Sequence, residues 1–188
     1  GSVGKTTTRE LINATLSPLG EIVSTRENEN NDIGVPKTIL RSTENDAAIV
    51  LEMGMRGLGQ IERLSHFSEP NIAVITNVGQ AHLGLLGSRA NIAKAKSEIT
   101  SNLKSDGVVI IPYGDPLLEK ALKEKWSGRI IRVAIENCLS DKLGLKKKDV
   151  LFENIESTYI SQIDLDRKFI LFQGNKLKLP LEGRHNAM

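Results

Sequence analysis

Gly1-Ser2-Val3-Gly4-Lys5-Thr6-Thr7-Thr8 opens the chain and has the form of a phosphate-binding loop that leads into a helix. Glycines let such a backbone bend until its N–H groups converge on phosphate oxygens. Lys5 would reach the β- and γ-phosphates of a nucleotide, and the Thr6 hydroxyl could ligate Mg²⁺. A typical phosphate-binding loop follows a buried strand, and its first glycine would lie two positions before Gly1. The alternative is that Gly1-Ser2 is the remnant of a cleaved tag, which leaves a chance Gly-Lys-Thr.

Short apolar runs alternate with helical patterns along the following sequence. We expect strands at 21–25, 47–51, 72–75, 108–111 and 130–133, and helices at 5–19, 34–41, 89–103, 116–125 and around Ile61 and Leu64. The runs at 47–51 and 72–75 are apolar throughout, as in strands covered on both faces. This alternation predicts an α/β fold with a mainly parallel, doubly wound sheet flanked by helices.

The pattern changes after residue 148. Residues 159–165 alternate between polar and apolar, and the runs at 169–172 and 176–179 flank Gly174-Asn175, which is typical of a hairpin. We therefore expect antiparallel strands near the C-terminus that continue the core.

Composition excludes several classes of protein. The 188 residues are 39% hydrophobic and carry a net charge of +2, so bulk charge favours neither nucleic acid nor a membrane surface as partner. The lone Cys138 excludes an intramolecular disulfide and favours a reducing compartment. No apolar run approaches the roughly 20 residues that span a bilayer. We expect a cytoplasmic protein.

Polar residues follow two of the predicted strands. Glu52 comes directly after the run at 47–51, and Thr76-Asn77 follow the run at 72–75, with His82 in the next loop. Ligands of parallel α/β sheets gather at the carboxyl ends of strands, where a carboxylate beside a phosphate loop can hold Mg²⁺. A solvated strand end or a helix cap explains Glu52 equally well, and a lone His82 is more often a structural hydrogen-bonding residue.

The predicted helix from Arg89 separates two lysines. Lys96 borders the apolar face formed by Ile92 and Ile99, whereas Lys94 lies off that face and could form an exposed ion pair with Glu98. Desolvation favours the neutral, nucleophilic form of a lysine at a buried margin. The alternative is a lysine whose stem runs along apolar surface with its ammonium in water.

These segments together resemble the central ATPase domain of the Mur ligases. The matching blocks, in family order, are GSVGKTTT at 1–8, NENNDIGVP at 28–36, EMGM at 52–55, GQI at 59–61, ITNVG at 75–79, AH at 81–82, GS at 87–88, AKAK at 93–96 and GRHN at 183–186. The block at 28–36, which by itself would be read as a turn, favours the Mur ligases that add D-alanyl-D-alanine. Another Mur-type ligase or a folylpolyglutamate synthase-like enzyme is the alternative.

The resemblance implies an ATP-dependent acid–amino-acid ligase of bacterial peptidoglycan precursor synthesis. Its substrates would be UDP-N-acetylmuramoyl-tripeptide and D-alanyl-D-alanine, and its cofactors ATP and Mg²⁺. The carboxylate of the first substrate would attack the γ-phosphate to give an acyl phosphate, and the amine of the second would then displace phosphate. Positioning and charge neutralisation are what phosphoryl transfer needs.

The resemblance also implies a role for individual residues. Residues 1–7 would hold the phosphates, with Lys5, His82 and Lys96 as catalytic residues and Thr6, Glu52 and His82 at the metal. Lys96 would be the lysine that many Mur ligases carbamylate. The acceptor substrate would lie near Asn28, Asn30 and Asn31, and the adenine near His185 and Asn186.

The Mur ligases have an N-terminal domain for the UDP-sugar and a C-terminal domain that closes over ATP, and the resemblance covers neither. We therefore expect residues 1–188 to be a central domain truncated at both ends, loosely folded and inactive by itself. Two other functions stay open: a P-loop NTPase that does not ligate, and a non-catalytic module that keeps the fold for binding a partner.

Overall fold

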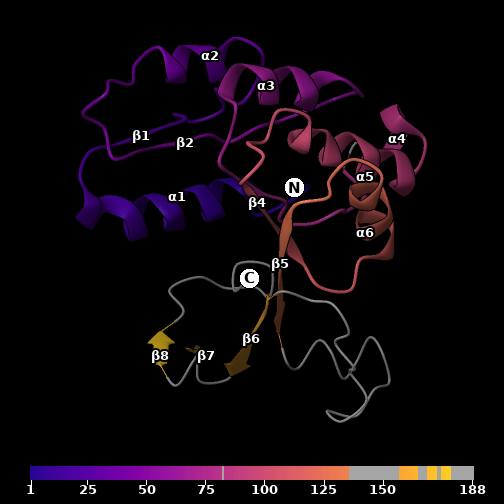
Figure 1. Ribbon diagram of the computed structural model, residues 1–188. Coiled ribbons are helices and arrows are strands. Elements are labelled where there is room, and N and C mark those ends of the chain that lie inside the picture. Colours follow the sequence, from indigo (N-terminus) through magenta and orange to yellow (C-terminus); the bar gives the residue numbers. More distant parts are fainter. Residues whose placement is uncertain (82, 136–156, 165–168, 173–174, 179–188) are drawn as a thin grey trace.

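The computed structural model describes residues 1–81, 83–135, 157–164, 169–172 and 175–178 (Figure 1). His82, Cys138, His185 and Asn186 lie outside these ranges. The helices are α1 Lys5–Leu16, α2 Gly34–Ile39, α3 Gln60–Ser68, α4 Leu83–Leu86, α5 Arg89–Ser97 and α6 Pro116–Lys123, with 3-10 turns η1 Ser17–Leu19 and η2 Glu98–Thr100. The strands are β1 Ile22–Ser24, β2 Ala48–Val50, β3 Ile72–Val74, β4 Val108–Pro112, β5 Arg129–Ile135, β6 Ser157–Asp164, β7 Phe169–Phe172 and β8 Asn175–Lys178. Within the described ranges, no helix combines the length and apolar character that crossing a membrane requires.

The strands form two sheets. One holds β1 and β2 in parallel, and the other has the order β3-β4-β5-β6-β7-β8. Strands β3 to β6 pair in parallel, whereas β6, β7 and β8 pair antiparallel. The predicted parallel α/β order and the antiparallel C-terminal strands are therefore confirmed. The structure differs from the single sheet that was predicted, because β2 and β3 are edges of two separate sheets.

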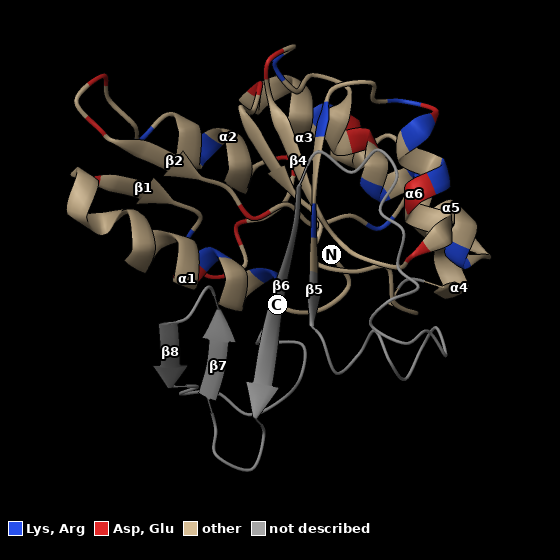
Figure 2. Cartoon of the chain, turned by 60° about the horizontal axis from the view of Figure 1, so that its bottom comes forward, with Lys and Arg blue, Asp and Glu red and all other residues tan. Residues whose placement is uncertain are grey.

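Helices lie on both sides of the two-stranded sheet but leave part of β2 exposed. Figures 1 and 2 both show α1 on one side of β1 and β2 and α2 on the other. On the six-stranded side α5 packs along α6, and Ile92, Val109, Leu118 and Leu122 are fully buried there. The N-cap predicted for α5 is confirmed, because the Ser88 hydroxyl accepts a hydrogen bond from the Asn91 N–H. The helix ends earlier than predicted and tightens into η2.

A cavity of about 1090 Å³ lies between the two sheets. Its walls include β2, β3 and one side of α1, and its rim includes Gly1, Lys5, Glu52 and Lys96. The prediction that β2 and β3 are covered on both faces is wrong. Ile49 is 43% exposed and Ile72 is 59% exposed, because each side chain borders this cavity instead of a neighbouring strand.

Candidate active site

The opening loop turns into α1 through Gly4, whose φ of 77° is a left-handed conformation that suits glycine. The first backbone hydrogen bond of the helix runs from the Thr8 N–H to the Gly4 carbonyl. The N–H groups of Lys5 and Thr6 therefore have no partner within the helix, and no side chain caps α1. Such a terminus attracts an anion through its N–H groups and the helix dipole.

The end of β3 holds the loop in place. The Asn77 Oδ1 accepts hydrogen bonds from the N–H groups of Ser2 (2.9 Å) and Val3 (3.1 Å). The Val3 carbonyl accepts from Asn77 Nδ2 (3.0 Å) and from the Thr76 hydroxyl (2.7 Å). A Cβ on Gly1 would lie 1.6 Å from Thr76 Oγ1, so this close approach requires glycine. The sequence located Thr76 and Asn77 at the site but gave them no role.

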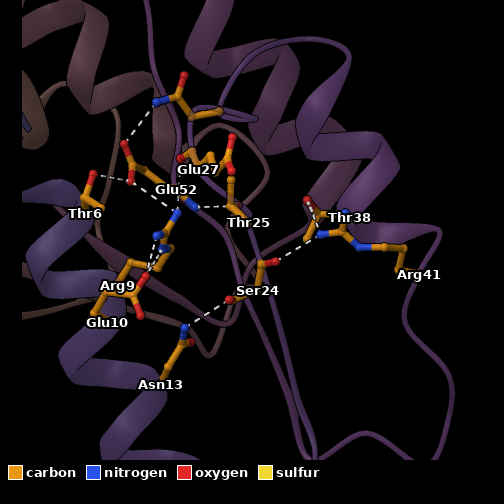
Figure 3. A network of polar contacts seen from close by, with 11 residues as sticks. Thr6, Arg9, Glu10, Asn13, Ser24, Thr25, Glu27, Thr38, Arg41 and Glu52 are labelled. Atoms are coloured by element: carbon orange, nitrogen blue, oxygen red, sulfur yellow. Dashed lines mark hydrogen bonds and ion pairs between the residues drawn. The ribbon is translucent and has the colours of Figure 1, made fainter.

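Glu52 is buried at the end of β2, with 6% of its surface exposed. Its Oε2 accepts from the Thr6 hydroxyl (2.8 Å), and its Oε1 accepts from Asn30 Nδ2 (2.9 Å). The Glu52 N–H donates to Thr25 Oγ1 (2.9 Å) (Figure 3). A solvated strand end is therefore excluded. Because the Thr6 hydroxyl donates its hydrogen bond to the carboxylate, the lone pairs of its oxygen stay available to a cation.

The three asparagines after β1 line the cavity, and their contacts differ. Asn30 fixes Glu52 through its side chain and accepts from the Gly54 N–H through its carbonyl (2.7 Å). Asn31 Oδ1 accepts from the N–H groups of Ile33 and Gly34 at the start of α2, both at 3.0 Å. The block therefore builds a turn and also carries one residue, Asn30, to the carboxylate.

Lys96 and Lys94 have the exposures that helical periodicity predicts. Lys96 is buried, with 5% of its surface exposed, and Lys94 is exposed. Burial, and then the nearby charge of Lys5, lower the pKa of the Lys96 ammonium to about 8. An amine with this pKa is neutral far more often at neutral pH than an ordinary lysine.

The predicted ion pair between Lys94 and Glu98 is wrong. Glu98 is 4% exposed, and its carboxylate accepts hydrogen bonds from the backbone N–H groups of Gly59 (2.8 Å) and Glu62 (3.4 Å). The change from α5 to η2 at residue 98 removes the regular spacing of four residues on which the pairing depended. Glu98 instead satisfies N–H groups at the start of α3.

We expect Glu98→Ala to lower the free energy of unfolding by about 1–3 kcal/mol, because it leaves two N–H groups at a partly buried helix end without their acceptor. Urea unfolding followed by the fluorescence of Trp126, the single tryptophan, measures this. Glu44→Ala, at an exposed position, is the matched control and should change little. Equal stabilities for the two variants would show that the cap contributes nothing.

The structure thus brings Lys5, Asn30, Glu52 and Lys96 to one cavity, and Thr6 contacts Glu52 there. His82, His185 and Asn186 lie outside the described residues, so their roles stay predictions. Arg9 is a residue that the sequence analysis missed: its guanidinium lies 3.7 Å from Glu52 Oε2. Its position could have been inferred from the sequence, because Arg9 follows Thr6 by three residues and therefore lies on the same face of the helix.

The donor set fits magnesium. No cluster of three or more His, Cys, Asp or Glu side chains suited to a metal occurs within the described part of the chain. Glu52 and Thr6 offer a carboxylate and a hydroxyl that share a hydrogen bond. Mg²⁺ keeps several waters and commonly uses one or two carboxylates together with the phosphates of a substrate. Glu52 and Thr6 suit a metal of that kind.

The family model described as "Mur ligase middle domain" matches residues 1–188. A "UDP-N-acetylmuramoyl-tripeptide–D-alanyl-D-alanine ligase" of Synechocystis is 42% identical over 188 residues, which are 100% of this chain and 37% of that protein. The ligase of the same name in Bacillus subtilis is 49% identical over 121 residues, 64% of this chain and 26% of that protein. The chain therefore spans about 37% of the first relative and 26% of the second.

Solved structures show the same fold. A crystal structure of MurF from Acinetobacter baumannii has a TM-score of 0.77 at 32% identity and covers 99% of this chain and 38% of that chain. MurF ligase from Thermotoga maritima, in complex with ADP, has a TM-score of 0.63 at 32% identity over 70% of this chain and 31% of that chain.

Proposed function

Because this chain belongs to the Mur ligase family through its middle domain, we propose that it is the nucleotide-binding domain of a larger ligase. That ligase joins D-alanyl-D-alanine to UDP-N-acetylmuramoyl-tripeptide at the cost of ATP, in the bacterial cytoplasm. The relatives that carry this activity in their names support the substrates, and the ADP complex of the Thermotoga maritima enzyme supports the nucleotide. The observation that carries the proposal is the meeting of Lys5, Glu52 and Lys96 at one rim.

Other domains would supply the remaining contacts to the substrates. The partial coverage of the relatives supports this division. The opening loop meets the ends of both β2 and β3, because Glu52 contacts Thr6 and Asn77 contacts Ser2. This domain would therefore supply the contacts to the phosphates.

In the proposed reaction, a carboxylate oxygen of the tripeptide attacks the γ-phosphorus of ATP and ADP leaves. The amine of D-alanyl-D-alanine then attacks the acyl carbon, loses a proton and displaces phosphate. Lys5 and the N–H groups at the start of α1 hold the phosphates. Thr6 and Glu52 would hold Mg²⁺, which would neutralise phosphate charge.

We further propose the roles that the family resemblance implies for the remaining residues. Lys96 reacts in its neutral form with carbon dioxide to give a carbamate and a proton, and its buried amine supports this. Asn28, Asn30 and Asn31 lie on the acceptor side. His82 serves the metal, and His185 and Asn186 lie near the adenine.

Phosphate release by the whole ligase tests the function. We expect ATP to be split to ADP and phosphate only when both UDP-N-acetylmuramoyl-tripeptide and D-alanyl-D-alanine are present. Phosphate release in the absence of both UDP-N-acetylmuramoyl-tripeptide and D-alanyl-D-alanine would identify an NTPase that does not ligate. Failure to bind Mg²⁺·ATP at all would identify a non-catalytic module. Residues 1–188 alone are expected to form no product, and repeated turnover by them would contradict the proposed division into domains.

A further inference from the structure

Arg9 is an arginine buried beside the carboxylate of Glu52. Its side chain is 7% exposed, and it lies on α1 one turn beyond Thr6. Figure 2 shows that the charged residues of α1 gather at the end of the helix nearest the N-terminus. A guanidinium is rarely buried without partners, because removing its charge from water is costly.

Three elements meet at this guanidinium (Figure 3). Its Nη1 lies 3.7 Å from Glu52 Oε2 and donates to the Glu27 carbonyl (3.3 Å), in the loop after β1. Its Nε donates to Glu10 on α1 at 3.2 Å, and its Nη2 pairs with the same carboxylate. The side chain of Glu10 is 60% exposed, so water screens that pair strongly, whereas the side chain of Glu52 is only 4% exposed. Glu52 is therefore the partner for which the charge of Arg9 matters most.

Hydrogen bonds orient Glu52 without help from Arg9. Thr6 and Asn30 each bind one carboxylate oxygen at 2.8–2.9 Å, and Thr25 binds the backbone N–H of the same residue. At 3.7 Å, Arg9 is beyond good hydrogen-bond distance from that carboxylate, so it acts on Glu52 mainly through its charge.

We propose that Arg9 balances the charge of Glu52 and thereby weakens the affinity of the site for a divalent cation. This inference rests on the proposed function, in which Glu52 and Thr6 hold Mg²⁺. Lys5 lines the same cavity as Arg9 and Glu52, so a second cation besides Arg9 opposes a divalent cation bound there. A divalent cation then binds firmly only together with a polyphosphate, whose negative charge outweighs theirs.

Removing the charge of Arg9 therefore tightens metal binding. Repulsion between a single and a double positive charge about 6 Å apart, even in a medium as polar as water, corresponds to about tenfold in a dissociation constant. Loss of the guanidinium also leaves Glu52 without its counter-charge until a metal arrives. A purely structural arginine would behave in the opposite way, because its loss would disturb Glu52 and weaken metal binding or leave it unchanged.

The test is a titration of the nucleotide-free whole ligase with Mn²⁺, in which electron paramagnetic resonance measures the unbound ion. We expect Arg9→Met to bind Mn²⁺ about tenfold more tightly than the wild type, and Arg9→Lys to stay within about twofold of it. Arg9→Gln, which keeps a donor for the Glu27 carbonyl, should tighten binding in the same way and replaces Arg9→Met if that variant does not fold.

Arg41→Met is the matched control. Arg41 also donates to a backbone carbonyl at the end of β1, that of Ser24 (3.0 Å), and pairs with a glutamate, Glu29, at 3.2 Å. It has no contact with Glu52, so its loss should leave Mn²⁺ affinity unchanged.

Unchanged or weaker Mn²⁺ binding by folded Arg9→Met and Arg9→Gln variants would overturn the inference. Glu52→Gln distinguishes this result from a failure of the proposed function. If Glu52→Gln weakens Mn²⁺ binding and the Arg9 variants do not tighten it, only the role of Arg9 is wrong. If Glu52→Gln has no effect on Mn²⁺ binding, Glu52 is not a metal ligand and both proposals fail.

Discussion

Lys5→Ala in the whole ligase is expected to lower acceptor-dependent ATP turnover by about 10²–10³-fold, the loss typical of removing one preorganised group that stabilises transition-state charge. Lys5 is the first residue of α1 and lines the rim beside Lys96 and Glu52. Its ammonium is the compact cation placed to meet phosphate oxygens in front of the helix terminus. Phosphate release under saturating substrates measures the effect.

The charge of Lys5 also acts on its neighbour. Lys5 lowers the pKa of Lys96, so Lys5→Ala should raise the pKa of Lys96 and reduce its neutral fraction. Lys123→Ala, at an exposed position of α6, is the control and should retain wild-type turnover. Near-normal turnover by Lys5→Ala would remove this residue from the site and with it the reason to regard residues 1–8 as a phosphate loop.

Lys96→Ala is expected to lower acceptor-dependent turnover by about a hundredfold or more, if its carbamate contributes as much as one stabilising group at the reacting phosphate. The neutral form is the one that reacts with carbon dioxide. A pKa of about 8 instead of 10.5 makes that form roughly 300-fold more abundant at neutral pH. Because the neutral fraction rises with pH through this pKa and levels off only above it, carbamate formation should rise from neutral pH to beyond pH 8.

Two measurements separate a carbamate from a plain cation at this position. Removal of carbon dioxide and bicarbonate should lower wild-type turnover, and a short carboxylic acid such as formate should restore part of the activity of Lys96→Ala. Lys94→Ala lies two residues away on the exposed face of α5 and should behave as the wild type. A loss of activity that responds to neither treatment would leave Lys96 as a residue of the site but exclude the carbamate.

Periodicity and strand order made much of this site predictable. A spacing of 3.6 residues separated buried Lys96 from exposed Lys94 before any coordinates. The rule that strand ends carry ligand-binding residues located Glu52, which is hydrogen-bonded to Thr6. Both patterns are local, so a single sequence contains them in full.

Contacts between distant segments were not predictable in this way. Asn77 binds a loop 75 residues earlier in the chain, and Glu98 binds Gly59, the N-cap of α3, which lies 39 residues before it. Arg9 reads as an ordinary helix residue until β2 and the loop after β1 pack around it. The separation of β2 from β3 was also missed, because apolar runs reveal burial but not which strand edges pair.

The hold of Asn77 on the opening loop has a consequence for ligand capture. Two N–H groups and one carbonyl of the loop are hydrogen-bonded to Asn77 within the fold itself, so the loop loses conformational entropy when the domain folds. A preorganised loop loses little further conformational entropy when a ligand binds, and this segment needs no closing motion. The speed with which a polyphosphate arrives is then governed by diffusion and by the positive potential of the rim.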